Sequence, residues 1–475
     1  MARQELADEV SPRTILQPRS RRLRWSEIVL LLSLGDVIAV TVATFLAIGA
    51  WSALPTDFVP GPFLGYWIAG SLLIWILALS FFDGYDVIAP TFWRSTLASV
   101  SRGFLFVMGA TVAVFFLLPF AFPRGVGLVA PAIAAVTLVA WRSVFARLIR
   151  GAQLARRVVL LGADEANLRI AELLVRSRSG VSYRPVAILT GASPNTTEIS
   201  GLPVIGSPAR LWDVVHERDV DEIVVGTEPE IAPIGQLALI ECFSRGVTAT
   251  PAVALYEALT GRVLASSLGT AWFTQIPTDP HRPYLVVKRL IDVVFVVLVS
   301  PVVLLASALI ALTILADSGF PIFYRQLRLG QRGETFVIHK FRTMLRDAEP
   351  QGPRFATRAD PRRTGVGRFL RRTRLDELPQ LWDVLRGHMS LIGPRPERPE
   401  FASRLREKLP LYEARLLVRP GVTGWAQTRL PYASDLEESL MKLEYDLYYV
   451  KHVGPILDLS IVLRTVGIVL RFAGR

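Results

Sequence analysis

The stretch that decides the fold is GVGRFLRRTRLDELPQLWDVLRGHMSLIGPRPE, residues 365–397. Its adjacent carboxylates, Asp376 and Glu377, follow a run of arginines and precede apolar residues spaced three and four positions apart. That spacing predicts an amphipathic helix. Proline is tolerated only in the first turn of a helix, so Pro379 places the start of this helix close to Asp376. We therefore expect both carboxylates at a helix N-terminus, beside the free N–H groups that bind anions.

Two buried neighbouring carboxylates repel each other unless a cation lies between them. Mg²⁺ suits such a pair, because it binds one or two carboxylates together with substrate phosphates. The preceding arginines supply donors for a polyanion such as a pyrophosphate. They are Arg368, Arg371, Arg372 and Arg374. The alternative is an ordinary capped helix start with a solvated basic face, but the GPRP turn at residues 393–396 favours a binding site.

The composition indicates a basic membrane protein. The chain has 475 residues, of which 51% are apolar, and a formal net charge of +12. This charge suits an anionic membrane surface and phosphate-rich substrates. We expect no nucleic-acid partner, because the arginines flank apolar segments instead of forming one stripe with interleaved aromatics. The single cysteine, Cys242, excludes an internal disulfide and a zinc site, and we expect it to be a small buried residue.

A polar cytoplasmic tail, residues 1–25, precedes four apolar segments that form the first domain, residues 26–150. The segments lie near residues 28–54, 63–82, 103–122 and 125–141. Most of them reach the roughly 20 residues that span a bilayer, and the last is marginal. The distribution of Lys and Arg places both ends of this domain in the cytoplasm by the positive-inside rule. Asp36 lies inside the first segment, where we expect a buried hydrogen bond to a polar partner.

Residues 151–256 are predicted to form a Rossmann-like α/β domain. Strand-like runs alternate with helical segments there, which indicates a parallel sheet. The runs are 156–163, 185–189, 220–226 and 246–253. Only Gly162 remains of a Gly-x-Gly-x-x-Gly fingerprint, and no acidic residue ends the second strand to hold a ribose. A docking role or support of a homodimer is therefore favoured over dinucleotide binding.

A linker, residues 257–283, leads to a third domain, residues 284–475. The first apolar segment of this domain, residues 288–315, is long enough to span a bilayer. It has basic residues on both flanks, however, and a span would place one of these flanks outside, against the positive-inside rule. Pro301 interrupts the backbone ladder near its middle, and Ser300 can satisfy the freed groups. We therefore expect a re-entrant helix-break-helix, broken at Ser300 and Pro301, that dips into one leaflet and returns.

The segment LDELPQLWDVLRGHMSLIGPRPE, residues 375–397, resembles the signature of the bacterial sugar transferases, the monotopic polyprenyl-phosphate phosphoglycosyl transferases. Further matching blocks follow in order: Lys288–Arg289, Ser300–Pro301, Phe323–Met344, Arg419–Gln427 and Tyr445–His452. Asp383 and His388 depart from the pattern, since we expect Asn and an acidic residue there. The resemblance implies a multi-domain membrane protein. Its expected parts are an α-helical four-span bundle, a Rossmann-like middle domain and an α/β monotopic catalytic domain with a re-entrant helix.

The resemblance also implies an enzyme that transfers a sugar-1-phosphate from a UDP-sugar to undecaprenyl phosphate and releases UMP. This would be the first membrane step of exopolysaccharide synthesis, at the cytoplasmic face of a bacterial inner membrane. UDP-glucose and UDP-galactose are the expected donors. Asp376 would attack the sugar-bearing phosphorus to give a phosphosugar–enzyme, and Glu377, with Asp376, would hold Mg²⁺. The substrate-binding positions implied by the motifs are Lys340, Arg342, Arg371, Pro394, Arg395, Pro396 and Asp446, the last as acidic support near the metal.

Two other functions stay open from the sequence. One is a membrane-anchored, NAD-dependent nucleotide-sugar dehydratase that uses the Rossmann-like domain. The broken glycine fingerprint argues against it, and we attribute the Tyr-x-x-x-Lys spacing of Tyr284 and Lys288 to chance. The other is a non-catalytic membrane scaffold, which the intact Asp376–Glu377 pair disfavours. Binding of NAD would identify the dehydratase, and UMP release from a UDP-sugar would exclude the scaffold.

Overall fold

The computed structural model describes most of the chain. The described residues are 25–52, 64–82, 84–85, 92–117, 124–150, 155–176, 183–190, 198–226, 234–267, 272, 274, 276, 283–345, 362–409, 411–430 and 436–470. The polar tail before residue 25 and much of the expected linker lie outside these ranges.

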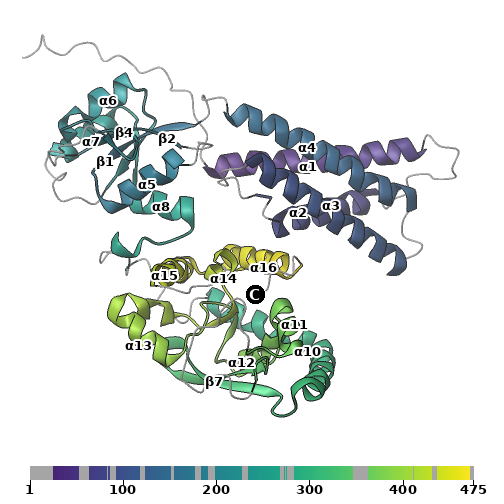
Figure 1. Cartoon of the computed structure of the whole chain (residues 1–475). Helices are drawn as coiled ribbons and strands as arrows, with labels where there is room; N and C mark the ends of the chain where they lie inside the picture. Colours follow the sequence, from purple (N-terminus) through teal and green to yellow (C-terminus); the bar gives the residue numbers. More distant parts are fainter. Residues whose placement is uncertain are drawn as a thin grey trace, which may run out of the picture. The chain divides into compact units, whose positions relative to one another are not determined.

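The four apolar segments form four helices, as predicted (Figure 1). They are α1 (Trp25–Ser52), α2 (Leu64–Phe81), α3 (Phe92–Leu117) and α4 (Arg124–Arg150). Helices α1, α3 and α4 contain stretches long and apolar enough to cross a membrane, and α2 contributes the shorter apolar stretch Ile68–Phe81. Two boundaries differ from expectation. Helix α3 already includes Arg94 and Arg102, which precede the expected segment 103–122, and α4 continues past the marginal segment to Arg150.

Asp36 in α1 has the polar partner that its position required. Its carboxylate accepts hydrogen bonds from Arg142 of α4, at 3.0 Å from Nε and 2.7 Å from Nη2. Both side chains are buried. The prediction of a buried hydrogen bond at Asp36 is confirmed, and the bond is part of a two-pronged ion pair that joins the first and fourth helices.

The middle of the chain forms a parallel sheet with the strand order β2-β1-β5-β6. The strands are β1 (Arg156–Leu161), β2 (Tyr183–Leu189), β5 (Glu222–Val225) and β6 (Thr248–Pro251). Helices α5 (Glu165–Arg176), α6 (Leu211–Glu217) and α7 (Ile234–Ser244) lie around this sheet (Figure 1). The predicted Rossmann-like sheet is confirmed, and Cys242 is buried in its core, beside Ile223 and Leu161. The small hairpin of β3 (Glu198–Ile199) and β4 (Leu202–Pro203) was not anticipated.

Helix α8 (Ala252–Thr260) follows β6 without an intervening loop. The residues after it were expected to be a linker, yet Val263, Trp272 and Ile276 are buried in one apolar cluster with residues of the third domain such as Tyr412 and Leu447. The described part of the expected linker therefore contributes to the core of the third domain.

The third domain is an α/β unit built on two small two-stranded sheets. Its elements are α10 (Pro283–Ser318), β7 (Phe323–Leu329), η4 (Gln331–Gly333), β8 (Thr335–Phe341), α11 (Gly365–Thr373), the 3₁₀ turn η5 (Leu375–Glu377), α12 (Gln380–Leu385), β9 (Ser390–Ile392), α13 (Pro399–Lys408), η6 (Tyr412–Leu417), β10 (Gly421–Thr423), α14 (Trp425–Arg429), α15 (Leu436–His452) and α16 (Pro455–Leu470). Strands β7 and β8 are antiparallel, whereas β9 and β10 are parallel. The two sheets bring the segments that carry the predicted site residues into one domain.

Helix α10 continues through Pro301, so the expected break at Ser300 and Pro301 is corrected to a continuous helix, and Ser300 compensates for the proline. A proline at position 301 leaves the carbonyl four residues earlier without its helical donor. That carbonyl belongs to Val297, and the Ser300 hydroxyl donates to it at 2.8 Å. The expected satisfaction of the freed backbone group is confirmed, and it lets the helix pass the proline without an unpaired acceptor.

Both ends of α10 pack on the catalytic domain, whereas its middle is bare. Near the start, Arg289 donates to the carbonyl oxygens of Val384 and Leu385 at 2.6 and 2.9 Å. Near the end, Ile310 and Ile314 are buried in a cluster with β8 and α11. Exposed large apolar side chains gather between these contacts, namely Leu298, Val302, Leu304, Leu305 and Leu309. The helix therefore presents an apolar surface around Pro301 while its two ends are held by protein.

Candidate active site

The carboxylate pair lies in a 3₁₀ turn, and the prediction that a helix begins near Asp376 is corrected. Helix α11 ends at Arg374, which adopts a left-handed conformation with φ of 58°. The turn η5 then carries Asp376 and Glu377, and α12 starts only at Gln380. Pro379 has no N–H to extend the ladder, so it occupies the N-cap of α12. Because α12 has only 6 residues, the charge balance of the pair comes from neighbouring side chains.

Glu377 is held by two cations from other segments. Its Oε1 lies 2.9 Å from Nζ of Lys340 on β8 and 2.6 Å from Nη2 of Arg395, which follows β9. Burial raises the pKa of Glu377, but Arg395 and Lys340 outweigh burial and hold that pKa well below its usual range. Burial likewise lowers the pKa of Lys340, and the charge of Glu377 opposes that shift. Glu377 is therefore a permanently ionised carboxylate with one oxygen already paired.

Asp376 has the opposite tendency. Its side chain is buried, with 8% of its surface exposed. Burial first, and then the charge of Glu377, raise the pKa of Asp376 to about 6, although Lys340 and Arg371 act against this rise. A carboxylate with a raised pKa is more basic, and hence more nucleophilic, than an ordinary one. The environment thus separates two adjacent acids into a fixed charge and a basic, titratable group, a pattern typical of catalytic pairs.

Two further predicted binding residues lie near this pair with different contacts. Arg371 donates through Nε to Oγ1 of Thr343 at 2.9 Å, and its charge lowers the pKa of Asp376. Arg342 is directed elsewhere. Its Nη2 donates to the carbonyl oxygens of Ser318 and Gly319 at 2.8 and 2.5 Å, so its guanidinium binds the C-terminal end of α10. The motif placed the two arginines in one class, whereas the structure gives Arg342 contacts with the C-terminal end of α10.

The remaining predicted residues belong to the segment GPRPE, residues 393–397, and to α15. Pro394 and Pro396 flank Arg395 and, lacking N–H groups, offer only their carbonyls. Asp446 of α15 was expected near the metal, and the structure places its carboxylate 2.7 Å from Nη2 of Arg415. Burial raises the pKa of Asp446, and the charge of Arg415 opposes that rise.

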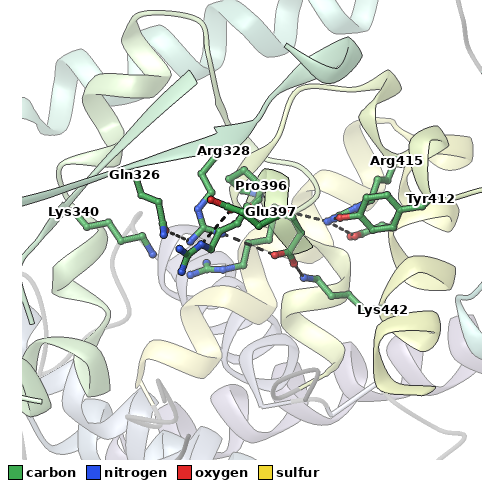
Figure 2. A network of polar contacts seen from close by, with 12 residues as sticks. Gln326, Arg328, Lys340, Pro396, Glu397, Tyr412, Arg415 and Lys442 are labelled. Atoms are coloured by element: carbon green, nitrogen blue, oxygen red, sulfur yellow. Dashed lines mark hydrogen bonds and ion pairs between the residues drawn. The ribbon is translucent and has the colours of Figure 1, made fainter. Parts of the chain in front are cut away.

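Sequence reasoning missed a network of charges behind Arg395, shown in Figure 2. Arg328 of β7 donates to the Pro396 carbonyl at 3.1 Å and to Oε1 of Gln326 at 2.6 Å. The Glu397 carboxylate forms an ion pair with Lys442 and lies 3.9 Å from Arg328. Burial raises the pKa of Glu397, but Lys442 and Arg415 reverse the effect and bring it to about 2. Arg328 and Glu397 stand inside the quoted motif blocks, so their position in those blocks was the available clue.

The two departures from the family pattern have partners in the structure. Asp383 is fully buried and accepts from the backbone N and ring Nδ1 of His339, at 3.0 and 2.8 Å. His388 lies against the ring of Phe336, with 5.7 Å between ring centroids. Because His339 directly precedes Lys340, the buried Asp383 helps to fix the strand that carries one of the two cations on Glu377.

Asp376 and Glu377 suit Mg²⁺ only as part of a larger set of ligands. Among the residues that the structure describes, no three His, Cys, Asp or Glu side chains gather as a complete metal site. A pair of neighbouring buried carboxylates is nevertheless the donor set that Mg²⁺ uses when substrate phosphates complete its shell. The residues present therefore fit a metal ion that binds together with the substrate.

Comparison with known proteins assigns this domain. The sequence model of the bacterial sugar transferases matches residues 283–472, which include every element from α10 to α16. The UDP-glucose:undecaprenyl-phosphate glucose-1-phosphate transferase of Caulobacter vibrioides is 41% identical over 181 residues, 38% of this chain and 68% of that protein. The chain belongs to the bacterial sugar transferase family. The resemblance inferred from the motifs is confirmed.

Other sugar transferases match over different shares of their length. The UDP-N-acetylgalactosamine-undecaprenyl-phosphate N-acetylgalactosaminephosphotransferase of Aeromonas hydrophila is 39% identical over 218 residues, 45% of this chain and 50% of that protein. An uncharacterized sugar transferase of Bacillus subtilis is 37% identical over 194 residues, 39% of this chain and 88% of that protein. The chain thus spans about half the length of the first and most of the second. A CoA-binding domain model matches residues 80–226, which cover strands β1, β2 and β5.

Proposed function

We propose that the chain transfers a sugar-1-phosphate from a UDP-sugar to undecaprenyl phosphate and releases UMP, at the start of exopolysaccharide synthesis. The observation that carries the proposal is the turn with Asp376 and Glu377, held by Lys340 and Arg395 inside the segment that matches the bacterial sugar transferases. Relatives bear the names of undecaprenyl-phosphate glucose and N-acetylgalactosamine phosphotransferases, which supports the same class of lipid acceptor.

The two acids divide the chemistry between them. An oxygen of Asp376 attacks the sugar-bearing phosphorus, the bond from that phosphorus to the bridging oxygen breaks, and UMP leaves with the electron pair. An oxygen of undecaprenyl phosphate then attacks the phosphosugar on Asp376 and releases the carboxylate. The raised pKa of Asp376 supports its role as the nucleophile, since it marks the more basic member of the pair. Glu377 is engaged by two cations and stays ionised.

The negative charge of the substrate phosphates would be compensated by a metal ion on the turn and by cations around it. Glu377 and Asp376 would hold Mg²⁺, which when bound neutralises negative charge on the substrate phosphates. Lys340, Arg371 and Arg395 surround the two carboxylates with positive charge. These three side chains are placed to bind the phosphates of the donor and to stabilise the oxygen on which charge develops as UMP leaves.

The bare middle of α10 supports insertion into one leaflet. Its exposed leucines suit lipid, while protein contacts hold both ends of the helix. A helix that enters and leaves through one face keeps the acidic turn on the side where nucleotide sugars are made, the cytoplasmic side of the inner membrane. The Rossmann-like module would act in docking or in forming a homodimer, which cross-linking in native membranes tests.

The donor sugar is proposed to be a hexose, with UDP-glucose and UDP-galactose as first candidates. The relatives are named for glucose and for N-acetylgalactosamine. UMP release measured over UDP-glucose, UDP-galactose and their N-acetylated counterparts therefore identifies the donor. An enzyme that releases UMP from none of these donors contradicts the proposed function.

The order of events is tested by leaving out the lipid. Enzyme mixed with UDP-sugar labelled in the sugar is expected to release one equivalent of UMP and to retain label on the peptide that contains Asp376, with ping-pong kinetics in the complete reaction. Direct attack by the lipid phosphate, with both acids serving only as metal ligands, predicts intersecting initial-rate lines and no labelled peptide. Glu377→Gln is the matched control. It alters the neighbouring acid and leaves Asp376 in place, so any label that this variant retains is expected on Asp376.

A further inference from the structure

The segment that carries Arg395 is hydrogen-bonded at each carbonyl from residue 394 to residue 397. The donors are Gly421 N to Pro394 O at 2.9 Å, Arg415 Nη2 to Arg395 O at 2.8 Å, Arg328 Nη1 to Pro396 O at 3.1 Å and Leu329 N to Glu397 O at 2.9 Å. The prolines on both sides of Arg395 fix their own φ angles. The backbone therefore presents the Arg395 side chain to Glu377 in one direction.

Arg415 differs from the other donors because its charge is buried. Its side chain is 3% exposed and lies between three partners. Nη1 donates to the Tyr412 hydroxyl at 2.9 Å, Nη2 donates to the Arg395 carbonyl, and Asp446 supplies the counter-charge at 2.7 Å (Figure 2 shows Arg415 and Tyr412). A buried ion pair adds little stability, since the cost of removing both charges from water offsets their attraction. Its location behind Arg395 points to a use in the site.

A chain of contacts thus connects α15 to the reacting turn. Asp446 neutralises Arg415, Arg415 holds the backbone of Arg395, and the Arg395 side chain binds Glu377. In the part of the chain that the structure describes, no hydrogen bond or ion pair joins the Asp446 carboxylate directly to Asp376 or Glu377. This differs from the role of metal support that the motif suggested for Asp446.

We propose that Asp446 is a positioning residue that acts through Arg415 to keep Arg395 on Glu377. The proposal rests on the proposed function, because it assigns Glu377 to the reacting pair. Without Asp446, the buried guanidinium of Arg415 lacks its counter-charge. We expect it to move toward another acceptor, which breaks its hydrogen bond to the Arg395 carbonyl. Arg395 then loses its fixed direction, and the negative charge that develops during the reaction loses a donor.

The main test is a double-mutant cycle on the full-length enzyme. Asp446→Asn is expected to lower kcat by about tenfold or more while changing the KM for UDP-sugar and the Mg²⁺ concentration for half-maximal rate by less than about twofold. In the Arg395→Ala background the same change is expected to lower kcat by less than about twofold further, since Asp446 acts through Arg395.

Two variants guard against a loss caused by misfolding. Glu444→Gln changes another buried acid on α15, whose partner is Arg262, and is expected to keep kcat within about twofold of wild type. Tyr412→Phe keeps the packed ring and removes only the hydroxyl that Arg415 binds, so a smaller loss of kcat, about threefold, is expected. An equal loss in Glu444→Gln would contradict the proposal.

Three other outcomes would also overturn it. Additive losses in the cycle would show that Asp446 acts independently of Arg395, and recovery of the Asp446→Asn rate at high Mg²⁺ would make Asp446 a metal ligand. If the wild-type enzyme releases no UMP, the proposed function fails first, and hydrogen exchange decides the positioning role. Faster exchange in residues 391–398 of Asp446→Asn, with none in Glu444→Gln, supports it, and unchanged exchange refutes it.

Discussion

Asp376 and Glu377 differ by one methylene in the side chain and by far more in their surroundings. Glu377 has two cations within hydrogen-bond distance of one oxygen. The pKa of Asp376, by contrast, is raised by burial and by the charge of Glu377. The positions of Lys340 and Arg395 therefore separate a carboxylate of fixed charge, Glu377, from a more basic one, Asp376.

Asp376→Asn is expected to abolish UMP release while leaving the protein folded and inserted in the membrane. The amide matches the carboxylate in shape but cannot form the phosphosugar–enzyme. Circular dichroism and membrane extraction check the fold, and a coupled UMP assay checks turnover. Activity within about tenfold of wild type, a loss of only ~1.4 kcal/mol in the barrier, would contradict the nucleophile assignment.

The rate of the lipid-free half-reaction is expected to depend on a single ionisation near pH 6. Asp376 reacts only as the carboxylate, and its pKa is raised to about 6, so the rate falls as the pH decreases through this value. The fall is about tenfold per pH unit below the break, because the pKa of Glu377 is held far lower and adds no second ionisation in this range. Stopped-flow measurement of UMP release between about pH 4.5 and about pH 8, a range that includes both sides of the break, tests this dependence. A rate independent of pH across this range would refute the assignment.

Residue types and motif spacing predicted the acids and three of their cationic neighbours, because these residues stand in recognisable blocks. Contacts such as that of Arg342 with the end of α10, or of Asp446 with Arg415, could not be predicted. They join segments distant in the sequence, and an arginine that binds a backbone carbonyl has the same local sequence as one that binds a phosphate.

At the scale of elements, α10 combines two packed ends with a bare apolar middle. Pro301→Leu restores an N–H opposite the Val297 carbonyl and so removes the need for the Ser300 hydroxyl. We expect this variant to shift α10 from a re-entrant to a spanning helix. Cysteines placed at Arg282 and Arg332 in a Cys242→Ser background, probed with an impermeant reagent from outside intact cells, measure the change.

In the parent both positions should be protected from outside, while a cysteine at Asp57, in the first expected external loop, should react. Position 332 should become reactive in Pro301→Leu. Labelling of only one of the two positions in the parent would show that the helix already spans.

The ion pair between α1 and α4 is expected to matter for folding and not for chemistry. Asp36→Leu removes the carboxylate that forms an ion pair with the buried Arg142, and breaking such a buried pair costs about 3–5 kcal/mol in comparable sites. The double variant Asp36→Leu/Arg142→Met removes both charges and should recover most of the lost stability. Each of the three proteins is heated in detergent, and the temperature at which it loses its monomer peak in size-exclusion chromatography is compared. Equal destabilisation in the double variant would contradict this account.

Apolar length and strand patterning predicted the four helices, the parallel sheet and an apolar helix at the start of the third domain; the re-entrant path of that helix stays a prediction. Their boundaries were less predictable. Helix α3 extends before its apolar segment because an exposed arginine such as Arg102 can keep its charge in water while the backbone stays helical. The start of α12 was misplaced because one turn of 3₁₀ helix has the same residue preferences as the α-helix that it precedes.

At the scale of the whole chain, the structure places the start of the catalytic unit before the family match begins. Glu257 binds Lys451 at 2.9 and 2.8 Å, and the indole N–H of Trp425 donates to the Gly261 carbonyl at 2.7 Å. A chain beginning at residue 252 keeps these contacts, whereas one beginning at residue 284 loses them and also loses the buried Trp272.

We expect the longer fragment to release UMP in the lipid-free assay within about tenfold of the full chain, and the shorter one to unfold at a lower temperature. The Bacillus subtilis relative has a length similar to that of the longer fragment, since 88% of its length corresponds to 39% of this chain. Parallel melting curves and UMP assays on the two fragments decide it. Equal melting temperatures would show that residues 252–283 are only a tether.

Arg374 links the free energy of folding to the charge of the site. A side chain other than glycine in the left-handed region, here at φ of 58°, costs roughly 1–2 kcal/mol. Selection for stability alone would favour glycine at this position. The guanidinium of Arg374 also helps to hold the pKa of Glu377 low, which glycine could not do. At Arg374 the chain therefore loses some folding stability to a strained backbone, and in return it keeps a positive charge beside the Asp376–Glu377 turn.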